Sequence, residues 1–527
     1  MGPFYPCESR RVRHRRRSRE AEQCSAPTGG IMRTGRAIVE GIHPRALHAT
    51  RDTSLLDAEQ GRSYHRSPWP TGRSRGLPAS GRGFCLPSRS ARPMRDALNR
   101  WTELWDDVQA LELPSRRMYS PMAEDNIHRY PAKMFPPLAQ VFLNHAVAAV
   151  GKRPRQLLFF DPCCGSGTTI LFAKLLGMRV AGSDLLKMAT VVTEAKTNVL
   201  SESALVQLGE ASQLSASELE MPTELDSWQY RELWFDDAVY RTLMSLRHWV
   251  SQVAGRDFFP HAVTALGQVV WDVSAADPDV IVPTRSRHSP GPPKLCAEEV
   301  IEAFRKRAAR IVRAQEALRR RGLSRRRTSV SLGDMKDAST WPVRKFDVVL
   351  CSPPYGDGID YRRAVSLQHR FFGFQDEFVE RKLTERMIGR RSYLSCTPLR
   401  RLVPEAEMKR RWLRTLDRSG SRRAKSLATY LQDMRQSLRS LGKGVSNDGL
   451  IGMVLGEPEM AGVRVPLAKL VSYIALGEGL VLTCPPGRDR IRKRSQTPVR
   501  RSSKGPISRE YLLQFKRAEP RRCAEGQ

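Results

Sequence analysis

The chain lacks the features that mark several common classes of protein. None of its ten Cys forms a CxxC pair, so the spacing predicts neither a zinc site nor a disulfide framework. No apolar run approaches the roughly 20 residues that a membrane helix needs. The Arg-rich start has no apolar segment of the kind found in secretory signals. We therefore expect a cytoplasmic protein, in a reduced compartment, with neither a bound metal nor membrane contact.

Lysine is absent before Lys133, although arginine is abundant there. Residues 1–95 are rich in Arg, Ser, Gly and Pro and show no sustained hydrophobic periodicity, which predicts a disordered segment. Two interpretations are open. The segment is either a basic arm that binds nucleic acid, or translated upstream sequence with the true start at Met32 or Met94. The lack of any packed element favours the second.

Positive charge dominates the whole sequence. The 527 residues carry a net charge of +33 with a pI near 10.4, which implies a polyanionic partner, most simply nucleic acid. A GC-rich genome also raises the Arg content, so the charge alone does not establish that partner. The hydrophobic content of 40% is enough for a substantial core.

One string places a glycine turn directly after a short apolar strand. In LLFFDPCCGSGTT (residues 157–169) the strand ends at Asp161, and Gly165, Ser166 and Gly167 precede the helix that starts near Thr168. Glycine is needed where the backbone passes close to a ligand. The Lys of GxxxxGK[ST] is missing, so this is not a phosphate-binding loop.

A second string ends another apolar strand in a rigid turn. In FDVVLCSPPYGDGIDY (residues 346–361), Pro353 and Pro354 stop the strand between Ser352 and Tyr355. Hydroxyl, turn and aromatic ring therefore stand at the carboxyl end of a strand, where open α/β sheets bind their ligands. The apolar Cys351 just before them is interpreted as a buried strand residue.

Four strings, in order, resemble motifs of the amino-methylating DNA methyltransferases. They are HRYPAKMFPP, DPCCGSGTT (with Cys163 where Phe is usual), SPPY, and the continuation GDGIDYRRAVSLQHRFFGF. The resemblance covers roughly residues 126–516. It implies an α/β fold with a Rossmann-like sheet and helices on both faces, and S-adenosyl-L-methionine as cofactor.

The resemblance also implies roles for single residues. Tyr130, Pro131 and Lys133 would cover the methionine end of the cofactor. The pocket itself would be formed by Asp161, Gly165, Ser166, Gly167 and Thr168. Asp184, at the end of the strand in MRVAGSD, would bind the ribose hydroxyls, although an N-cap for the next helix is equally compatible. Asp334 matches the adenine-binding acid by position only.

The catalytic roles follow from what an exocyclic amine needs. Its lone pair is delocalised into the ring, so hydrogen bonds to the Ser352 hydroxyl and the Pro353 carbonyl would return density to nitrogen. Pro354 would complete the turn, and Tyr355 would stack on a base flipped out of the duplex. No covalent intermediate is required.

The resemblance therefore predicts a site-specific DNA methyltransferase that acts on cytosine N4. Alternatives are an N6-adenine or RNA base methyltransferase and, in another class, a non-catalytic nucleic-acid-binding protein that keeps the fold. Implied partners are double-stranded DNA and a cognate restriction endonuclease. The oligomeric state is left open.

We divide the chain into residues 1–95 (Arg-rich segment), 96–199 and 328–517 (two parts of the methyltransferase domain), and 200–327, a basic helical insertion between strands two and three. Helical spacing at residues 239–253 and 300–312 supports the insertion. Its Arg305, Arg307 and Arg310 belong either to a DNA-contacting surface or to a solvated helix face.

Further along the chain, a basic, irregular loop is expected at residues 380–425 and a helix at 427–442. A strand follows at 449–455 and a closing hairpin at 480–483 and 510–515, with an exposed basic loop at 488–504 between its strands.

Overall fold

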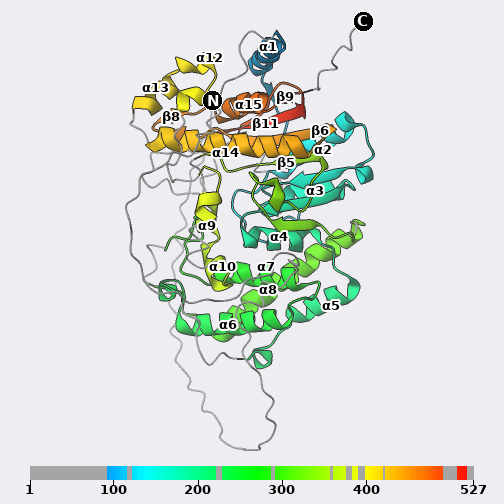
Figure 1. The fold of residues 1–527 in the computed structure, drawn as a ribbon. Helices are drawn as coiled ribbons and strands as arrows, with labels where there is room; N and C mark the ends of the chain where they lie inside the picture. The colour runs from blue at the N-terminus through cyan, green and yellow to red at the C-terminus, as the bar shows by residue number, and fades with distance from the viewer. Residues whose placement is uncertain are drawn as a thin grey trace, which may run out of the picture. The chain divides into compact units, whose positions relative to one another are not determined.

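Helices pack against both faces of a central sheet in the computed structural model (Figure 1). Contacts divide the chain between Arg45 and Ala46 into two units, and every described residue lies in the second. The described residues are 92–114, 122–220, 228–285, 291–323, 325–356, 360–374, 383–389, 398–418, 422–490 and 507–518. The predictions for residues 1–91 therefore lie outside the described part of the chain.

The parallel part of the sheet has five strands, and each overlaps a predicted one. Across the sheet they are β4 (Ser329–Leu332), β3 (Arg179–Asp184), β2 (Leu158–Asp161), β5 (Phe346–Cys351) and β6 (Val445–Gly456). β2 and β5 are neighbours, with Phe160 opposite Val349, although they are far apart in the sequence. The strand order changes direction between them, which defines the switch point where a Rossmann-like sheet binds its ligand.

An antiparallel edge extends the sheet beyond β6. β11 (Arg509–Arg517) pairs with β6, and both β9 (Leu480–Leu482) and β10 (Gly487–Arg490) pair antiparallel with β11. The predicted pairing of residues 480–483 with 510–515 is therefore present. However, Arg488–Arg490, expected in an exposed loop, belong to β10, and the short β1 (Gln109–Ala110) adds parallel to it.

Alternating side chains give the sheet two apolar faces. Phe159 and Val348 join the cluster beneath α2 (Pro136–Val150) and α3 (Thr168–Leu175). Phe160 and Val349 join the cluster on the opposite face. Three helices cover that second face: α14 (Arg422–Gly444), α15 (Leu467–Gly477) and α1 (Arg92–Asp106). Burying one such ring contributes about 1.5–3 kcal/mol, so both faces hold the sheet in place.

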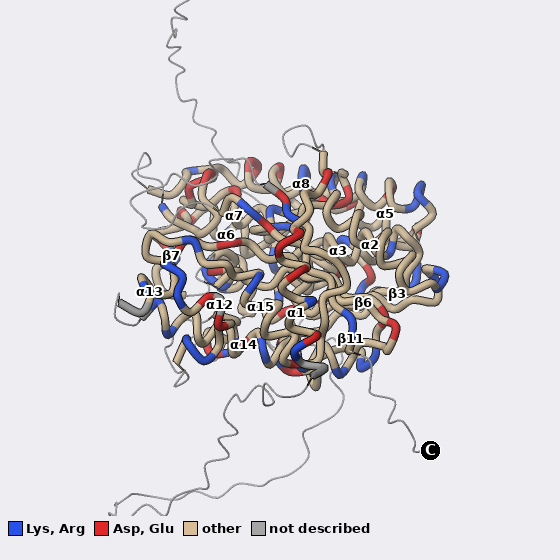
Figure 2. The backbone as a smooth tube through the Cα atoms, turned by 90° about the horizontal axis from the view of Figure 1, so that it is seen from above, with Lys and Arg blue, Asp and Glu red and all other residues tan. Residues whose placement is uncertain are grey.

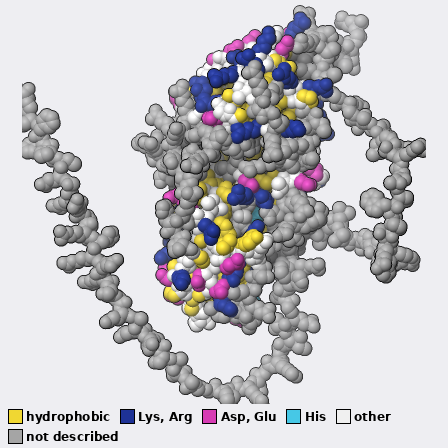
Figure 3. Space-filling view, turned by 90° about the vertical axis from the view of Figure 1, so that its left-hand side faces the viewer, with side chains coloured by type: hydrophobic (Ala, Val, Ile, Leu, Met, Phe, Trp, Pro, Cys, Tyr) yellow, Lys and Arg dark blue, Asp and Glu magenta, His cyan; other side chains and the backbone are white. Residues whose placement is uncertain are grey.

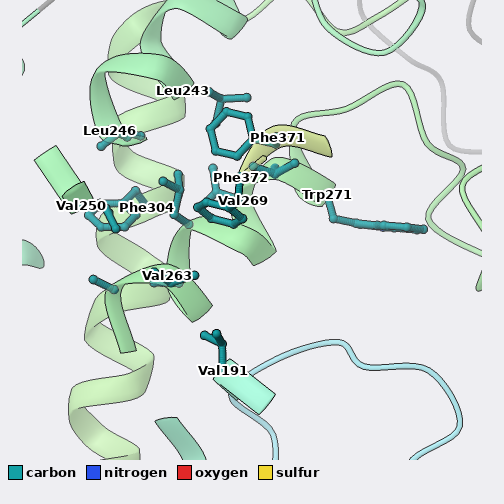
Figure 4. Packing of buried hydrophobic residues seen from close by; sticks show 14 of the residues in the cluster. Val191, Leu243, Leu246, Val250, Val263, Val269, Trp271, Phe304, Phe371 and Phe372 are labelled. Carbon is teal, nitrogen blue, oxygen red and sulfur yellow. The ribbon is translucent and has the colours of Figure 1, made fainter. Parts of the chain in front are cut away.

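The insertion between β3 and β4 forms its own hydrophobic cluster with α4 (Lys187–Thr197). Its helices are α5 (Glu202–Ala211), α6 (Asp237–Gln252), α7 (Phe259–Asp272) and α8 (Ala297–Arg320). Figure 4 shows Val263 and Val269 of α7 among side chains of α6 and α8. The sequence did not predict α7, in which every residue from His261 to Trp271 is buried.

The loop expected at residues 380–425 is partly helical. Within its described part lie η6 (Leu399–Leu402), α12 (Glu405–Met408) and α13 (Arg411–Arg418). Trp412, Leu413 and Leu416 of α13 are buried in the cluster beneath α14, which corrects the prediction of an irregular loop. Trp412, Leu413 and Leu416 lie on one side of α13, and this short amphipathic pattern was overlooked in a segment dominated by basic residues.

The remaining described elements are short. They are α9 (Tyr361–Ala364), α10 (Ser366–Phe371), β7 (Glu459–Met460), β8 (Val463–Arg464), η2 (Pro154–Gln156), η3 (Ala216–Glu218), η4 (Arg231–Leu233) and η5 (Ala338–Thr340). Within the described ranges, no helix is long and apolar enough to cross a membrane.

Candidate active site

The glycine loop after β2 has a backbone that only glycine readily adopts. Gly165 and Gly167 have φ values of +53° and +77°, in the left-handed region. A Cβ on Gly167 would lie 2.8 Å from Thr193 Oγ1 of α4, so a side chain there would push α3 and α4 apart. Without side chains at these two positions, the loop backbone can lie close to a ligand, and α3 begins directly after it at Thr168.

Asp161, the last residue of β2, is buried behind this loop. Its carboxylate accepts hydrogen bonds from the Cys163 amide at 3.0 Å and from the Thr169 hydroxyl. Burial raises the pKa of Asp161 to about 7, against the opposing effect of these two donors. A cationic ligand group in the pocket would favour the ionised form of this carboxyl.

Asp184, the last residue of β3, anchors the same loop. One carboxylate oxygen accepts from the Gly165 amide and the other from the Leu186 amide, both at 2.9 Å. Burial raises the pKa of Asp184 to about 6. The side chain therefore fixes the loop and begins the turn into α4, and each oxygen keeps a lone pair for a ligand hydroxyl.

The segment before α2 covers the glycine loop from the other side. The buried ring of Tyr130 would meet a Cβ on Gly165 at 3.4 Å, and Pro131 follows it along the pocket wall. Lys133 donates from Nζ to the Asp125 carbonyl at 3.0 Å. Burial, with the nearby Lys196 ammonium, lowers the pKa of Lys133 to about 7.

A buried ion pair beneath the loop was missed by the sequence reasoning. Lys196 of α4 is fully buried and lies 2.7 Å from Asp125 Oδ1. The Thr168 hydroxyl donates to the same carboxylate oxygen at 2.7 Å, and Lys196 Nζ also donates to Ser166 Oγ at 3.3 Å. Asp125 stands just before the HRYPAKMFPP string and Lys196 lies in no motif, so neither carried a recognisable signal.

Asp334 follows β4. Like Asp161 after β2 and Asp184 after β3, it lies at the carboxyl end of a strand that borders the site. Its carboxylate accepts from the Lys336 amide at 2.9 Å, and Arg386 Nε lies 3.5 Å from the other oxygen. Its carbonyl accepts from the Trp341 ring nitrogen at 2.9 Å. These contacts hold Asp334 against the pocket although it is the least specific of the predicted matches.

These residues enclose one pocket between the loops after β2, β3, β4 and β5. Its empty space is about 890 Å³, including the part that is open to solvent. The predicted site residues in its wall are Tyr130, Pro131, Lys133, Asp161, Gly165, Ser166, Thr168, Asp184, Asp334, Ser352 and Pro354. Gly167, Pro353 and Tyr355 are not in the wall. Residues in the wall that the sequence did not single out include Leu185, Met335, Tyr361 and Met387.

Tyr355 lies beside the pocket, packed against the end of β6. A Cβ on Gly456 would come within 2.6 Å of its ring. Its hydroxyl lies 2.7 Å from Ser352 Oγ and donates to Glu510 Oε1 of β11 at 3.1 Å. The predicted stacking of this ring on a flipped base stays a prediction. Cys351 is fully buried at the end of β5, as interpreted from the sequence.

A second, more polar hollow adjoins the pocket and shares Tyr130 to Lys133 with it. Its empty space is about 1810 Å³, open solvent included, and α7 and α8 form its other wall. Arg129, Arg307 and Arg310 line it, together with the buried His128. Neither ring nitrogen of His128 has a hydrogen-bond partner among the described residues. Burial and the nearby Lys133 lower the pKa of His128 to about 3.

The three predicted DNA-contacting arginines of α8 differ in their surroundings. Arg305 is bound by Glu298, by Glu302 and by the Leu214 carbonyl. Arg307 lines the polar hollow but pairs with Asp272 at 2.5 Å. Arg310 also lines the hollow and has no ion pair or hydrogen bond to another described residue. Of the three, Arg310 is therefore the one available to an external anion.

Comparisons with known proteins find one similar curated sequence. The type II methyltransferase M.MvaI of Kocuria varians is 25% identical over 245 residues, which cover 44% of this chain and 52% of the relative. The chain thus matches about half the length of that curated relative. No protein-family model matches.

Solved structures with limited similarity include two from the same broad class. The rRNA methyltransferase aviRa of Streptomyces viridochromogenes is 12% identical, with a TM-score of 0.28, covering 77% of this chain and 94% of that one. A putative RNA methyltransferase of Pyrococcus horikoshii is 10% identical, with a TM-score of 0.27, covering 80% and 98%. The Rossmann-like assignment of the fold rests on the strand order of this chain itself.

Proposed function

We propose that the protein is an S-adenosylmethionine-dependent DNA methyltransferase that methylates the exocyclic N4 amine of cytosine. The observation that carries this proposal is the meeting of two loops in one pocket. The glycine loop after β2 and the Ser-Pro-Pro-Tyr loop after β5 come together at the switch point of the sheet, and Ser352 is part of the pocket wall.

The residues of the pocket fit S-adenosylmethionine, which when bound supplies a methyl group on a positively charged sulfur. Gly165 and Tyr130 both lie in the pocket wall, and the backbone of Gly165, with a φ of +53°, has no Cβ to separate it from a ligand. The carboxylate of Asp161 suits the cationic methionine end, and the free lone pairs of Asp184 suit ribose hydroxyls. Asp334, next along the sheet edge, would bind the adenine amino group.

Ser352 has the position that the transfer chemistry requires. Its oxygen can accept a hydrogen bond from the target amine, which increases electron density on the nitrogen. The role of the Pro353 carbonyl as a second acceptor stays a proposal, since the Pro353 side chain is buried outside the pocket wall. Positioning of the amine against the methyl group would supply much of the rate.

DNA as the substrate is supported by charge and by the curated relative. The polar hollow beside the pocket presents Arg129 and Arg310, which suit a phosphate backbone. The relative is named as a type II methyltransferase, and the four strings of this chain resemble motifs of DNA methyltransferases. A cognate restriction endonuclease stays a prediction from the resemblance.

Nucleoside mass spectrometry of DNA from cells that express the protein tests the proposal. We expect N4-methylcytosine with the wild type, and at least about a 5-fold loss with Ser352→Ala, because one hydrogen bond contributes about 1–1.5 kcal/mol. Cofactor affinity, measured by calorimetry, should stay constant in this variant.

A matched control is Ser446→Ala, which removes a hydroxyl from the opposite end of β6, where it contacts Asp347. It should methylate as the wild type does. N6-methyladenine or a methylated RNA base as the sole product would contradict the base assignment. Cofactor binding without any methylation would favour a non-catalytic nucleic-acid-binding protein.

A further inference from the structure

Three side chains from two distant parts of the chain form a hydrogen-bonded line that leads away from the pocket. Ser352 Oγ lies 2.7 Å from the Tyr355 hydroxyl, which lies 3.1 Å from Glu510 Oε1. Ser352 is in the pocket wall, whereas Glu510 is half-buried on β11, next to β6 in the sheet. The line therefore connects the site of the target amine to a carboxylate that solvent can reach.

The chemistry of the last group sets the direction of every bond in this line. An ionised carboxylate only accepts, so the Tyr355 hydroxyl must donate to Glu510. The single proton of Tyr355 is then used, and its oxygen accepts from the Ser352 hydroxyl. Ser352 in turn has only lone pairs left, so it can accept a hydrogen bond from an amine but cannot donate one.

Tyr355 stays a neutral link in this line. Burial and the Glu510 carboxylate hold the pKa of Tyr355 well above its usual range, so the hydroxyl keeps its proton. Among the described residues, the titratable groups that face Glu510 include Tyr355, Tyr361 of α9, and Asp489, which lies opposite Glu510 on β10. The ring itself is fixed against Gly456, so the hydroxyl cannot easily turn away.

We propose that Ser352, Tyr355 and Glu510 form a relay that removes the proton which the target amine loses during methyl transfer. The nitrogen forms its bond to the methyl carbon as the carbon–sulfur bond breaks, and the electron pair of that bond stays on sulfur. The amine proton moves to Ser352 Oγ, the Ser352 proton to the Tyr355 oxygen, and the Tyr355 proton to Glu510. Glu510 then releases it to water, which restores all three groups.

This inference rests on the proposed function, because it needs an amine as the acceptor of the methyl group. It assigns to Glu510 a role that no sequence motif indicates. Glu510 touches neither substrate nor cofactor, so it acts as a positioning residue and final proton acceptor. If the Glu510–Tyr355 hydrogen bond only held the Ser-Pro-Pro-Tyr loop against β11, the same contacts would be present, but the rate of methyl transfer would not depend on the protonation of Glu510.

The test compares Glu510→Gln and Tyr355→Phe with the wild type in single-turnover transfer of a labelled methyl group to DNA, between pH 5 and 9. Gln keeps the size of Glu and can accept a hydrogen bond but cannot take up a proton. We expect each variant to transfer about 100-fold more slowly, the usual scale of acid–base catalysis. Affinities for S-adenosylmethionine and DNA should stay within a few-fold of the wild type.

The pH profile separates proton transfer from structural support. At saturating S-adenosylmethionine, where protonation of Asp161 and Asp184 does not limit cofactor binding, the wild-type rate should fall in acid as Glu510 becomes protonated, and this fall should be absent in Glu510→Gln. The double variant should be no slower than either single variant, because both break the same relay. Tyr511→Phe, which removes the hydroxyl of the next residue on β11, is the matched control and should behave as the wild type.

Two results would overturn the relay alone: an active wild type with equally active Glu510→Gln and Tyr355→Phe, or a Glu510→Gln variant that keeps the acid fall. If Glu510→Gln does not fold, the transfer rate of Tyr355→Phe tests the relay alone: a rate about 100-fold below that of the wild type supports it, and a wild-type rate overturns it. A wild type that binds the cofactor but methylates no DNA would overturn the proposed function and the relay together.

Discussion

The pocket and the helical insertion use polar residues in opposite ways. Around the pocket the charged groups are buried and tied to the backbone or to each other, as Asp184 is to Gly165 and Lys196 is to Asp125. In the insertion they lie on the surface and pair with neighbours, as Arg305 does with Glu298. Figure 2 shows acidic and basic residues interspersed along the helices of the insertion.

The same mixture appears on the molecular surface. On the face drawn in Figure 3, the described Lys and Arg side chains lie among acidic and hydrophobic ones, without forming one continuous basic area. Counting positive charges along a helix therefore overstates how many can meet a polyanion. The spacing of a motif is more informative, because it fixes which atoms converge on one place.

The largest expected difference between the two regions is in stability. Lys196→Met should lower the free energy of unfolding by about 3–5 kcal/mol, because it leaves Asp125 buried without its partner. Lys306→Met, which breaks the exposed pair with Glu302 on α8, should change it little. Urea unfolding of both variants measures this contrast, and equal losses would show that burial does not distinguish the two regions.

A smaller effect should appear when pH is varied. Folding raises the pKa of Asp161 to about 7 and that of Asp184 to about 6, so the folded state holds protons that the unfolded state releases. These two carboxyls should therefore lower the stability of the ligand-free protein as pH rises from about 4 to 7, at about 1.4 kcal/mol for each pKa unit. The neutral, buried His128 and His261, whose pKa values are lowered to about 3 and about 4, act in the opposite direction over the same range. Asp161→Asn removes one of the two falling contributions, so its stability should rise more with pH than that of the wild type, and a curve with the wild-type slope would contradict the buried-acid explanation.

The smallest expected effect separates two arginines on one helix. Arg310→Gln should reduce the slope of log affinity against log salt for DNA binding by about 0.9, the loss of one phosphate contact. Arg305→Gln should leave the slope unchanged, because Glu298 and Glu302 already hold that side chain. Fluorescence anisotropy at several salt concentrations measures both slopes. Equal changes would mean that α8 acts as a uniformly charged surface.

The strands and the two loops of the pocket could be predicted because their signals are local. An apolar run that ends in Asp161, or in Ser352 before two prolines, contains the strand, its end and the ligand-facing turn within a few residues. The Asp125–Lys196 pair and the Glu510 contact could not be predicted, since their partners come together only through the tertiary fold. The helix α7 was also missed, although every residue from His261 to Trp271 is buried and helps to form the core of the insertion.

The chain order of the strands has a consequence for synthesis. β2 is made early with its neighbour β3, but its other neighbour, β5, is made only after the whole insertion, and β11 comes near the end of the chain. The edge of β2 that pairs with β5 therefore stays unpaired, and the apolar rings of β2 stay partly exposed, while translation continues. Such long-range parallel pairing folds slowly and exposes strand edges in the meantime. The pocket can be complete only once the chain has been made as far as Ile388, well beyond the insertion.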